Sequence, residues 1–224
     1  MKNFYIIIGV VAVAGIAIIA LVLRGGGSAA TEPVDLGELA DAELLELAQG
    51  MVDGDPNAPV TIMEFGNYQC NTCRQFALLI KPQVDMAYVE TGQAKFVYYD
   101  YPSAGFPHSF LAARAARCAG DQERYFDYHD AVYRTFDDWV LQRSAAGHFE
   151  DLADEIGLDT GAFEECLNSD RFADVVTANI TLGQRLGVPG TPGIFVHHGT
   201  GTAQRLGGFQ FIDIQQAMEA GPGN

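Results

Sequence analysis

The sequence predicts an α/β protein in which two strand-containing parts are separated by a run of helices. An apolar stretch at residues 60–65 is followed by a helical pattern and by a second apolar stretch at 94–101, as in a strand–helix–strand unit with a parallel crossover. Residues 103–187 show helical spacing of apolar side chains instead. Residues 193–197 again read as a strand. A chain of 224 residues can therefore hold one sizeable domain with an insertion.

The chain is strongly acidic. It carries 29 Asp and Glu against 13 Lys and Arg, which gives a formal net charge of −16 at pH 7. A surface of this sign repels phosphate backbones and anionic lipid headgroups. We therefore expect no nucleic-acid partner.

The N-terminus contains an apolar run, residues 4–23, without a charged side chain. Twenty helical residues span about 30 Å, the thickness of a bilayer's hydrocarbon core. This predicts a membrane anchor at residues 1–24. The alternative is a signal peptide cleaved after Ala30. Lys2 and Arg24 nearly balance across the run, so charge alone does not orient it.

Between the apolar run and the folded domain, residues 25–54 are predicted to form a flexible tether and a short acidic helix. The helix is expected at 41–51 with Asp41 as its N-cap. After the first strand, a helix is expected to end before Pro82, with 84–90 continuing it beyond a kink.

Five helices are expected in the insertion, at 108–119, 122–136, 148–156, 161–167 and 171–186. Its aromatic side chains should fill its core, because aromatic residues at helical spacing usually do. They are Tyr125, Phe126, Tyr128, Tyr133, Phe136 and Trp139. The chain should then close with the strand at 193–197, a turn at 199–201, a return strand at 203–206 and a helix at 209–220.

Cys70 and Cys73 lie where the first strand should pass into the helix. A spacing of three places both sulfurs on one side of the first helical turn, where free N–H groups and the helix dipole stabilise a thiolate. A redox-active dithiol is the favoured interpretation; half of a zinc site and a structural disulfide are the alternatives. Zinc would need two further ligands, and no second such pair follows. A stable disulfide needs an oxidising compartment, which places the bulk of the chain outside the cytoplasm.

Two further features bear on this site. Pro192 directly precedes a predicted strand, and a cis Thr191–Pro192 bond would present the Thr191 backbone to an extended substrate opposite the dithiol; an ordinary trans turn is the alternative. Strand alternation places Glu64 with Ile62 on one face of the first strand. Burial there would raise the pKa of the Glu64 carboxyl, whereas an exposed edge position would not.

A Cys-x-x-Cys pair beside a strand–helix–strand unit indicates a thioredoxin-like redox motif. The pattern Glu-Phe-x-x-Tyr-x-Cys-x-x-Cys at 64–73, the helical insertion, Gly-Val-x-Gly-Thr-Pro at 187–192 and the closing strand–turn–strand–helix together resemble the DsbA-like branch of the thioredoxin superfamily. That branch comprises thiol:disulfide oxidoreductases of bacterial envelopes. The resemblance covers about residues 55–218. It implies a thioredoxin-like domain from 55–102 and 188–220 and a helical insertion at 103–187.

The resemblance also assigns roles. Cys70 is implied to be the nucleophile, Cys73 to resolve the mixed disulfide, and Glu64 to be the buried acid that helps protons reach and leave Cys73. The residues expected to contact substrate are Asn71, Thr72, Thr191 and Pro192. Some relatives carry a second, structural disulfide across the insertion, which implies a bond between Cys118 and Cys166; two buried free thiols are the alternative.

The chain departs from the strongly oxidising members of this branch. Asn71 and Thr72 stand where those members have Pro-His, and Thr191 stands where they have Val. We therefore expect a less stabilised thiolate and a reduction potential between about −120 mV and about −270 mV. His108, at the start of the insertion, is expected to cap or pack, or else to approach the dithiol.

The expected function is that of a membrane-anchored, extracytoplasmic thiol:disulfide oxidoreductase acting as an oxidase. No dissociable cofactor or metal is expected, because the disulfide is itself the reagent. The expected partners are cysteine-containing envelope or secreted proteins and a quinone-linked membrane protein that re-oxidises the pair. A reductase or an isomerase is the alternative; isomerases of this superfamily are usually dimers with an added module, and the sequence predicts a monomer. A Cu(I) carrier using the same cysteines is a second class.

Overall fold

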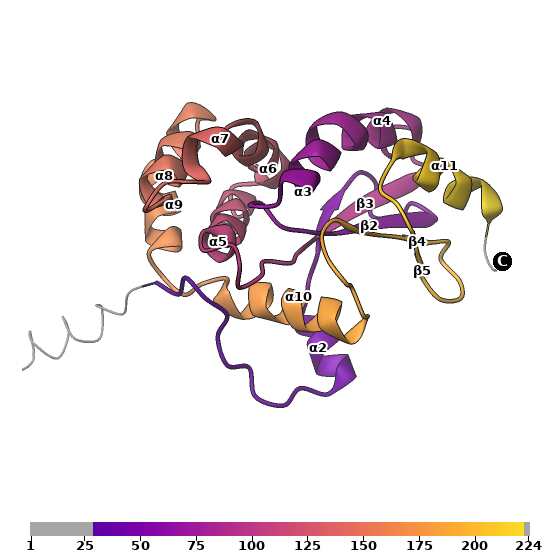
Figure 1. Ribbon diagram of the computed structural model, residues 1–224, viewed down its shortest axis with the longest axis horizontal. Coiled ribbons are helices and arrows are strands. Elements are labelled where there is room, and N and C mark those ends of the chain that lie inside the picture. The colour runs from indigo at the N-terminus through magenta and orange to yellow at the C-terminus, as the bar shows by residue number, and fades with distance from the viewer. Residues whose placement is uncertain (1–28, 222–224) are drawn as a thin grey trace, which may run out of the picture.

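The computed structural model describes residues 29–221, and within them five strands form one sheet (Figure 1). The strand order is β1-β3-β2-β4-β5, with β2 and β3 parallel and the other neighbours antiparallel. The strands are β1 (Met51–Asp53), β2 (Val60–Gly66), β3 (Ala94–Asp100), β4 (Gly193–His197) and β5 (Gln204–Arg205). The predicted parallel crossover and the closing hairpin are therefore confirmed.

From Asn71 to Val89 the chain is helical without a break. It runs through α3 (Asn71–Gln75), η1 (Phe76–Ile80), α4 (Lys81–Val84) and η2 (Asp85–Val89), where η marks π-helical turns. The prediction that the helix ends before Pro82 is wrong. The Lys81 N–H bonds to the Phe76 carbonyl in the wider π pattern, and this wider turn directly precedes Pro82, which has no N–H to donate.

The insertion contains α5 (Ser109–Gly120), α6 (Tyr125–Arg134), α7 (Phe136–Trp139), α8 (Ala146–Glu155) and α9 (Thr160–Leu167). The predicted helix at 122–136 is shorter, and α7 follows it as a separate turn that the sequence did not indicate. Most of the predicted aromatic side chains are buried in the insertion, and Phe126 packs against the same core while partly exposed.

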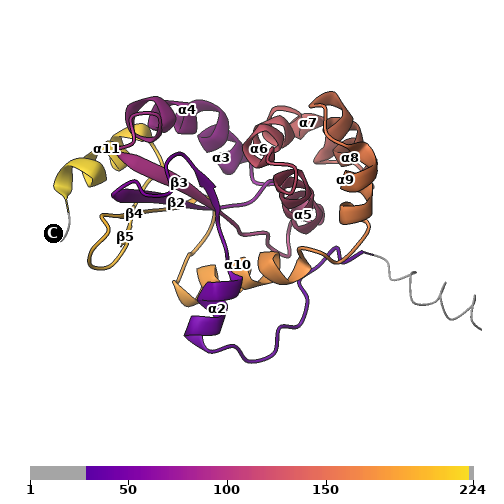
Figure 2. The ribbon, with the colours of Figure 1, turned by 180° about the vertical axis from the view of Figure 1, so that it is seen from behind.

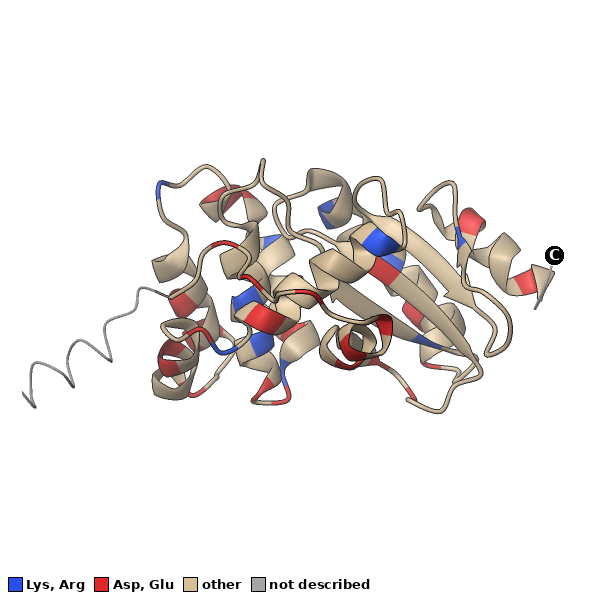
Figure 3. Cartoon of the chain, turned by 90° about the horizontal axis from the view of Figure 1, so that it is seen from below, with Lys and Arg blue, Asp and Glu red and all other residues tan. Residues whose placement is uncertain are grey.

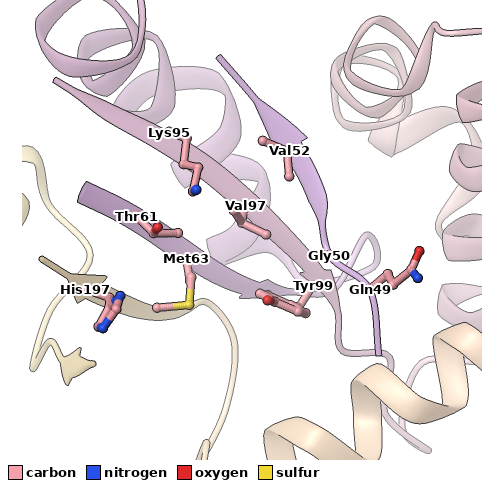
Figure 4. Close-up of a pocket in the computed structure, with 9 residues that line it drawn as sticks. All are labelled: Gln49, Gly50, Val52, Thr61, Met63, Lys95, Val97, Tyr99 and His197. Atoms are coloured by element: carbon pink, nitrogen blue, oxygen red, sulfur yellow. The ribbon is translucent and has the colours of Figure 1, made fainter. Parts of the chain in front are cut away.

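Helices cover both faces of the sheet (Figures 1 and 2). One face is covered by α3, α4 and α11 (Phe211–Ala220), and the other by α10 (Ala173–Arg185) and α2 (Asp41–Leu47). Alternation along β2 sends Ile62 into the large core and Phe65 into the cluster beneath α2 and α10. The second face is not fully covered, and Figure 4 shows the hollow that remains. It is lined by Gln49, Gly50, Val52, Thr61, Met63, Lys95, Val97, Tyr99 and His197.

The segment 25–54 is not simply a tether. Arg114 donates a hydrogen bond of 2.6 Å to the Ala30 carbonyl, the Val34 N–H donates one of 3.0 Å to Thr177, and β1 pairs with β3. The folded body therefore begins well before residue 55. The predicted anchor at 1–24 lies outside the described residues, and within 29–221 no helix is both long and apolar enough to cross a bilayer.

The helix predicted at 41–51 is shorter. α2 ends at Leu47, and Met51 already belongs to a strand. Its N-cap is Ala40 and not Asp41, because the Glu43 carboxylate accepts a hydrogen bond of 2.9 Å from the Ala40 N–H.

A buried ion pair joins the insertion to the sheet. Arg117 on α5 donates from Nε to the Asp100 carboxylate at 2.5 Å, and their side chains are 4% and 0% exposed. Arg117 also donates to the Gln49 carbonyl at 2.8 Å, while the Asp100 N–H donates to the Asn179 side chain at 3.1 Å. This pair therefore holds α5, the end of β3, α10 and the entry to β1 together.

A disulfide closes the insertion on itself. Cys118 on α5 is bonded to Cys166 on α9, with a Cα–Cα distance of 5.8 Å across a sequence separation of 48 residues. This is the pairing that the resemblance implied. It leaves Cys70 and Cys73 as the free thiols of the described chain.

Candidate active site

The dithiol lies where β2 passes into α3. Cys70 is the N-cap of α3 in an extended conformation, and Cys73 lies in the first turn. Cys70 is partly exposed, whereas Cys73 is 0% exposed. A reactant from solution can therefore reach only Cys70.

The loop before Cys70 is tied to the insertion through Gln69. The Gln69 side chain donates to the Val140 carbonyl at 3.0 Å and accepts from the His108 N–H at 2.8 Å. His108 is the N-cap of α5, and its Nε2 lies 2.8 Å from the Gln142 carbonyl. Of the positions expected for His108, the structure therefore shows the helix cap, with its ring bonded within the insertion and not to a cysteine.

The proline loop lies against Cys70. The Thr191–Pro192 peptide bond is cis, and the Thr191 carbonyl oxygen lies 3.5 Å from Cys70 Sγ. Gly193 begins β4 and pairs with Phe65 of β2, which brings the loop beside α3 although it is more than a hundred residues away in sequence. The four residues expected to contact substrate are each at least partly exposed; they are Asn71, Thr72, Thr191 and Pro192.

The surroundings of Cys70 favour its thiolate. A hydrogen bond from the Cys73 thiol is the main cause, and the Thr191 side chain and the N–H groups of Cys73 and Thr72 add to it, against the cost of partial burial. Together they lower the pKa of Cys70 from 9.0 to about 5. This lies between the values of about 3.5 and about 7 that are typical of DsbA and thioredoxin.

The surface charge is unevenly spread in a way that suits this thiolate. Figure 3 views the molecule from the side of α2 and α10, where acidic positions are frequent. Residues 101–120, which contact the loop before Cys70 through His108 and Gln69, and residues 175–212, which contain Thr191 next to Cys70, have no Asp or Glu. Neither segment therefore brings a carboxylate to this part of the site.

Cys73 has the opposite character. Burial raises its pKa well above 9.0, and the neighbouring Cys70 and Glu64 raise it further. The Asn67 N–H lies 3.5 Å from Cys73 Sγ as a donor. Cys73 is therefore a protonated thiol at neutral pH, whereas the neighbouring nucleophile, Cys70, is a thiolate.

Glu64 is buried on the sheet face beneath Cys73. Its side chain is 0% exposed, and neither carboxyl oxygen has a hydrogen-bond partner among residues 29–221. Burial raises the pKa of Glu64 well above its ordinary value, although the Lys81 charge acts in the opposite direction. A raised pKa favours the protonated carboxyl, which can give its proton to a neighbouring sulfur.

Sequence reasoning missed a cluster of buried polar side chains that reaches Glu64 and Cys73 through Tyr98 and Tyr133. Its members are Tyr68, Tyr98, Tyr133 and His129, and all are buried. Tyr98 could have been found from alternation, since it lies directly opposite Glu64 in the parallel β2–β3 register. His129 lies on the predicted aromatic helix face but comes from a distant element, and no local pattern marks it.

The lowered pKa of Cys70 leads to a pH prediction. The thiolate absorbance near 240 nm of the reduced protein should appear with a midpoint near pH 5. Because the folded pKa is below the unfolded one, ionisation of Cys70 stabilises the reduced fold fully only above about pH 8.5. That contribution falls as the pH drops toward 5. The stability of the reduced form relative to the oxidised form should therefore rise between pH 5 and 8.5 in urea titrations, and a flat difference would contradict the assignment.

Within residues 29–221 there is no group of three or more His, Cys, Asp and Glu side chains that could hold an ion. The hollow of Figure 4 is lined by residues of β1, β2, β3 and β4 and by Gln49 and Gly50 before β1, and neither cysteine is among them.

Comparison with known proteins agrees with this geometry. The family model described as "Thioredoxin" matches residues 46–210. The chain is 29% identical over 147 residues to Disulfide bond formation protein D of Bacillus subtilis, which covers 64% of this chain and 66% of that protein. It is 25% identical over 150 residues to a putative protein-disulfide oxidoreductase of Rickettsia typhi, covering 66% of this chain and 54% of the relative. The match thus spans between half and two thirds of these relatives.

Solved structures show the same fold. The oxidised crystal structure of BdbD from Bacillus subtilis superposes with a TM-score of 0.67 at 26% identity, over 77% of this chain and 95% of that one. Wolbachia pipientis alpha-DsbA1 superposes with a TM-score of 0.68 at 22% identity, over 83% and 92% of the two chains. At the latter identity the likeness concerns the fold alone.

Proposed function

Because this chain belongs to the thioredoxin family and is a DsbA-like homologue of protein-disulfide oxidoreductases, we propose that it oxidises cysteine pairs of extracytoplasmic proteins with its Cys70–Cys73 disulfide. One observation carries the proposal. The accessible Cys70 has a pKa lowered to about 5, and the adjacent, buried Cys73 has a pKa raised well above 9.0. This asymmetry separates a sulfur that exchanges with substrates from a sulfur that only closes the ring.

The exchange proceeds in two steps. A substrate thiolate attacks Cys70 Sγ, the Cys70–Cys73 bond breaks, and Cys73 leaves as a buried thiolate that takes a proton from the neutral Glu64 carboxyl. The second substrate thiolate then attacks the substrate sulfur of the mixed disulfide, and Cys70 leaves as a stable thiolate. The substrate gains one disulfide, and two electrons pass to the dithiol.

The stabilised reduced state supports the oxidase direction. A couple becomes more oxidising as its dithiol form is stabilised, and the hydrogen bonds to the Cys70 thiolate stabilise that form. Continued turnover then needs a partner that takes the two electrons, and a quinone-linked membrane protein has this chemistry. The second disulfide, Cys118–Cys166, supports an oxidising compartment. The apolar run at 4–23 supports a membrane anchor.

The test is the reduction potential of the full-length chain, equilibrated in glutathione buffers, with Cys70→Ser as the blank. A value of about −200 mV or higher supports an oxidase, and a value near −270 mV shows a reductase instead. If no exchange occurs while the protein binds one equivalent of Cu(I), the metal carrier replaces the enzyme.

A further inference from the structure

His129 on α6 lies inside a cage of aromatic rings. The centroid of its ring lies 4.8 Å from that of Tyr98, 5.0 Å from Tyr133 and 5.5 Å from Tyr68. The side chain is 0% exposed, while that of Asp130, which lies 2.9 Å from His129 Nδ1, is 41% exposed. His129 therefore connects the interior of the cage to a carboxylate at the surface.

The Asp130 contact sets the state of the imidazole ring. A carboxylate only accepts hydrogen bonds, so Nδ1 carries the proton and Nε2 of the neutral ring is an acceptor. Nε2 is buried and has no hydrogen-bond partner among residues 29–221. Burial lowers the pKa of His129 below its ordinary value, which keeps the ring neutral near pH 7. The titratable or charged groups around it are Tyr68, Lys81, Tyr98, Asp100, Tyr125, Asp130 and Tyr133.

The cage reaches the redox centre through Tyr98. Tyr98 lies directly opposite Glu64 on the neighbouring strand. A side-chain carbon at Gly66 would lie 2.5 Å from the Tyr98 hydroxyl, so this hydroxyl lies over the backbone next to Asn67, whose N–H contacts Cys73. Tyr98 thus extends from the Glu64 position to the vicinity of the buried sulfur.

The hydroxyl groups of Tyr98 and Tyr133 have two protons between them, and their mutual hydrogen bond uses only one. The Tyr98 and Tyr133 hydroxyl oxygens are 3.1 Å apart and share one hydrogen bond in which either can donate. Two hydroxyl protons serve that single bond, so the second is available to another acceptor. The Glu64 oxygens and His129 Nε2 are among the buried acceptors that lack a partner in the described residues; the others are Asp85 Oδ1 and Asp100 Oδ1. Lys81 is already committed to Asp53 and Asp85 at 2.7 and 2.8 Å.

We propose that the Tyr98–Tyr133 hydroxyl pair and His129 carry the Cys73 proton out to Asp130 when the dithiol is re-oxidised. This inference rests on the proposed thiol exchange and adds the proton route to it. The neutral Glu64 carboxyl first passes its proton through the hydroxyl pair to His129 Nε2. The carboxylate so formed takes the proton of Cys73 as the Cys73 sulfur attacks Cys70 Sγ of a mixed disulfide, and the partner's thiolate leaves. Glu64 is thus neutral again once the ring has closed. The His129 imidazolium, paired with the Asp130 carboxylate, loses its proton to solvent through Asp130.

The route can be tested with the full-length reduced protein and oxidised glutathione as the probe. Cys70 first attacks glutathione, and Cys73 then closes the ring; rapid acid quenching and mass analysis separate the two steps. In His129→Gln, Tyr98→Phe and Asp130→Asn, ring closure should slow by about 10²-fold, the lower range for lost acid–base assistance, with an altered pH profile and solvent isotope effect. The first step should keep its rate, and the equilibrium reduction potential should stay within error.

Matched controls come from the same insertion. Tyr128→Phe removes a buried tyrosine hydroxyl bonded to the Phe149 carbonyl at 2.8 Å, and His148→Gln removes a ring bonded to Thr135 at 2.9 Å. The proposal fails if the cage variants close the ring at the wild-type rate, or if the controls slow it equally. If the wild-type protein performs neither step, the proposed function itself is wrong, and the proton route falls with it.

Discussion

The Cys73→Ser variant is expected to accumulate as a covalent complex with its substrates. Cys70 keeps its partly exposed position and its hydrogen bonds from the Thr191 side chain and the N–H groups of the first turn of α3, and the serine hydroxyl can donate in place of the Cys73 thiol, so Cys70 still attacks a disulfide. The sulfur that would release the mixed disulfide is missing. Non-reducing gels should therefore show high-mass species that disappear with reductant, and multiple turnover should fall to the assay background.

The Cys70→Ser variant is the matched control. Cys73 remains, but it is 0% exposed and protonated, so neither adducts nor exchange should be seen. Adducts of equal yield in both variants would show that Cys73 is reachable and would contradict the division of roles between the two sulfurs.

The Asp100→Asn variant is expected to lose about 3–5 kcal/mol of unfolding free energy. It leaves the Arg117 guanidinium, 4% exposed, without its only charged partner within 4 Å in the described chain. The Arg117 charge then lies buried between α5, β3 and α10 with no opposite charge, because its other contacts, the Gln49 carbonyl and the Asn179 side chain, are neutral acceptors. Urea titration of the protein with the Cys118–Cys166 disulfide intact measures the loss.

Two further variants serve as controls for this measurement. Asp127→Asn breaks a surface pair with Arg124, both partners of which are largely exposed, and should cost no more than about 1 kcal/mol. The double variant Asp100→Leu, Arg117→Met removes both buried charges and should recover most of the loss. If Asp100→Asn is no more harmful than Asp127→Asn, the buried pair does not hold the insertion to the sheet.

The main strands could be predicted because their signals are local. Residues 60–65, 94–101 and 193–197 are apolar runs next to turns, and each lies within a residue of a strand in the structure. β1 could not be found this way. It has only three residues, Met51–Asp53, and it is a strand because it pairs with the edge of β3. The same long-range pairing ends α2 earlier than its apolar pattern suggests.

In the candidate site, too, the features with a local sequence signal could be predicted and those that depend on long-range contacts could not. The cysteine pair and the proline loop were visible as short motifs, and Glu64 followed from alternation along β2. The cage around His129 was not visible, because it forms only where α6 of the insertion meets Tyr98 of β3 and Tyr68 of the loop before α3. Contacts between elements far apart in sequence produce no local sequence pattern at the residues that make them.

The disulfide of the insertion also gives the chain a particular connectivity. Cys118 and Cys166, 48 residues apart, close a covalent ring that contains α6, α7 and α8. The exposed segment 141–144, where Leu141 is 91% exposed, lies within that ring. A single break in the backbone there converts the ring into two arms that stay joined at the sulfurs. The C-terminal fragment, which carries α10 and the Thr191–Pro192 loop, thus remains joined to the fragment that carries Cys70 and Cys73, and damage at this point does not divide the molecule until the bridge is reduced.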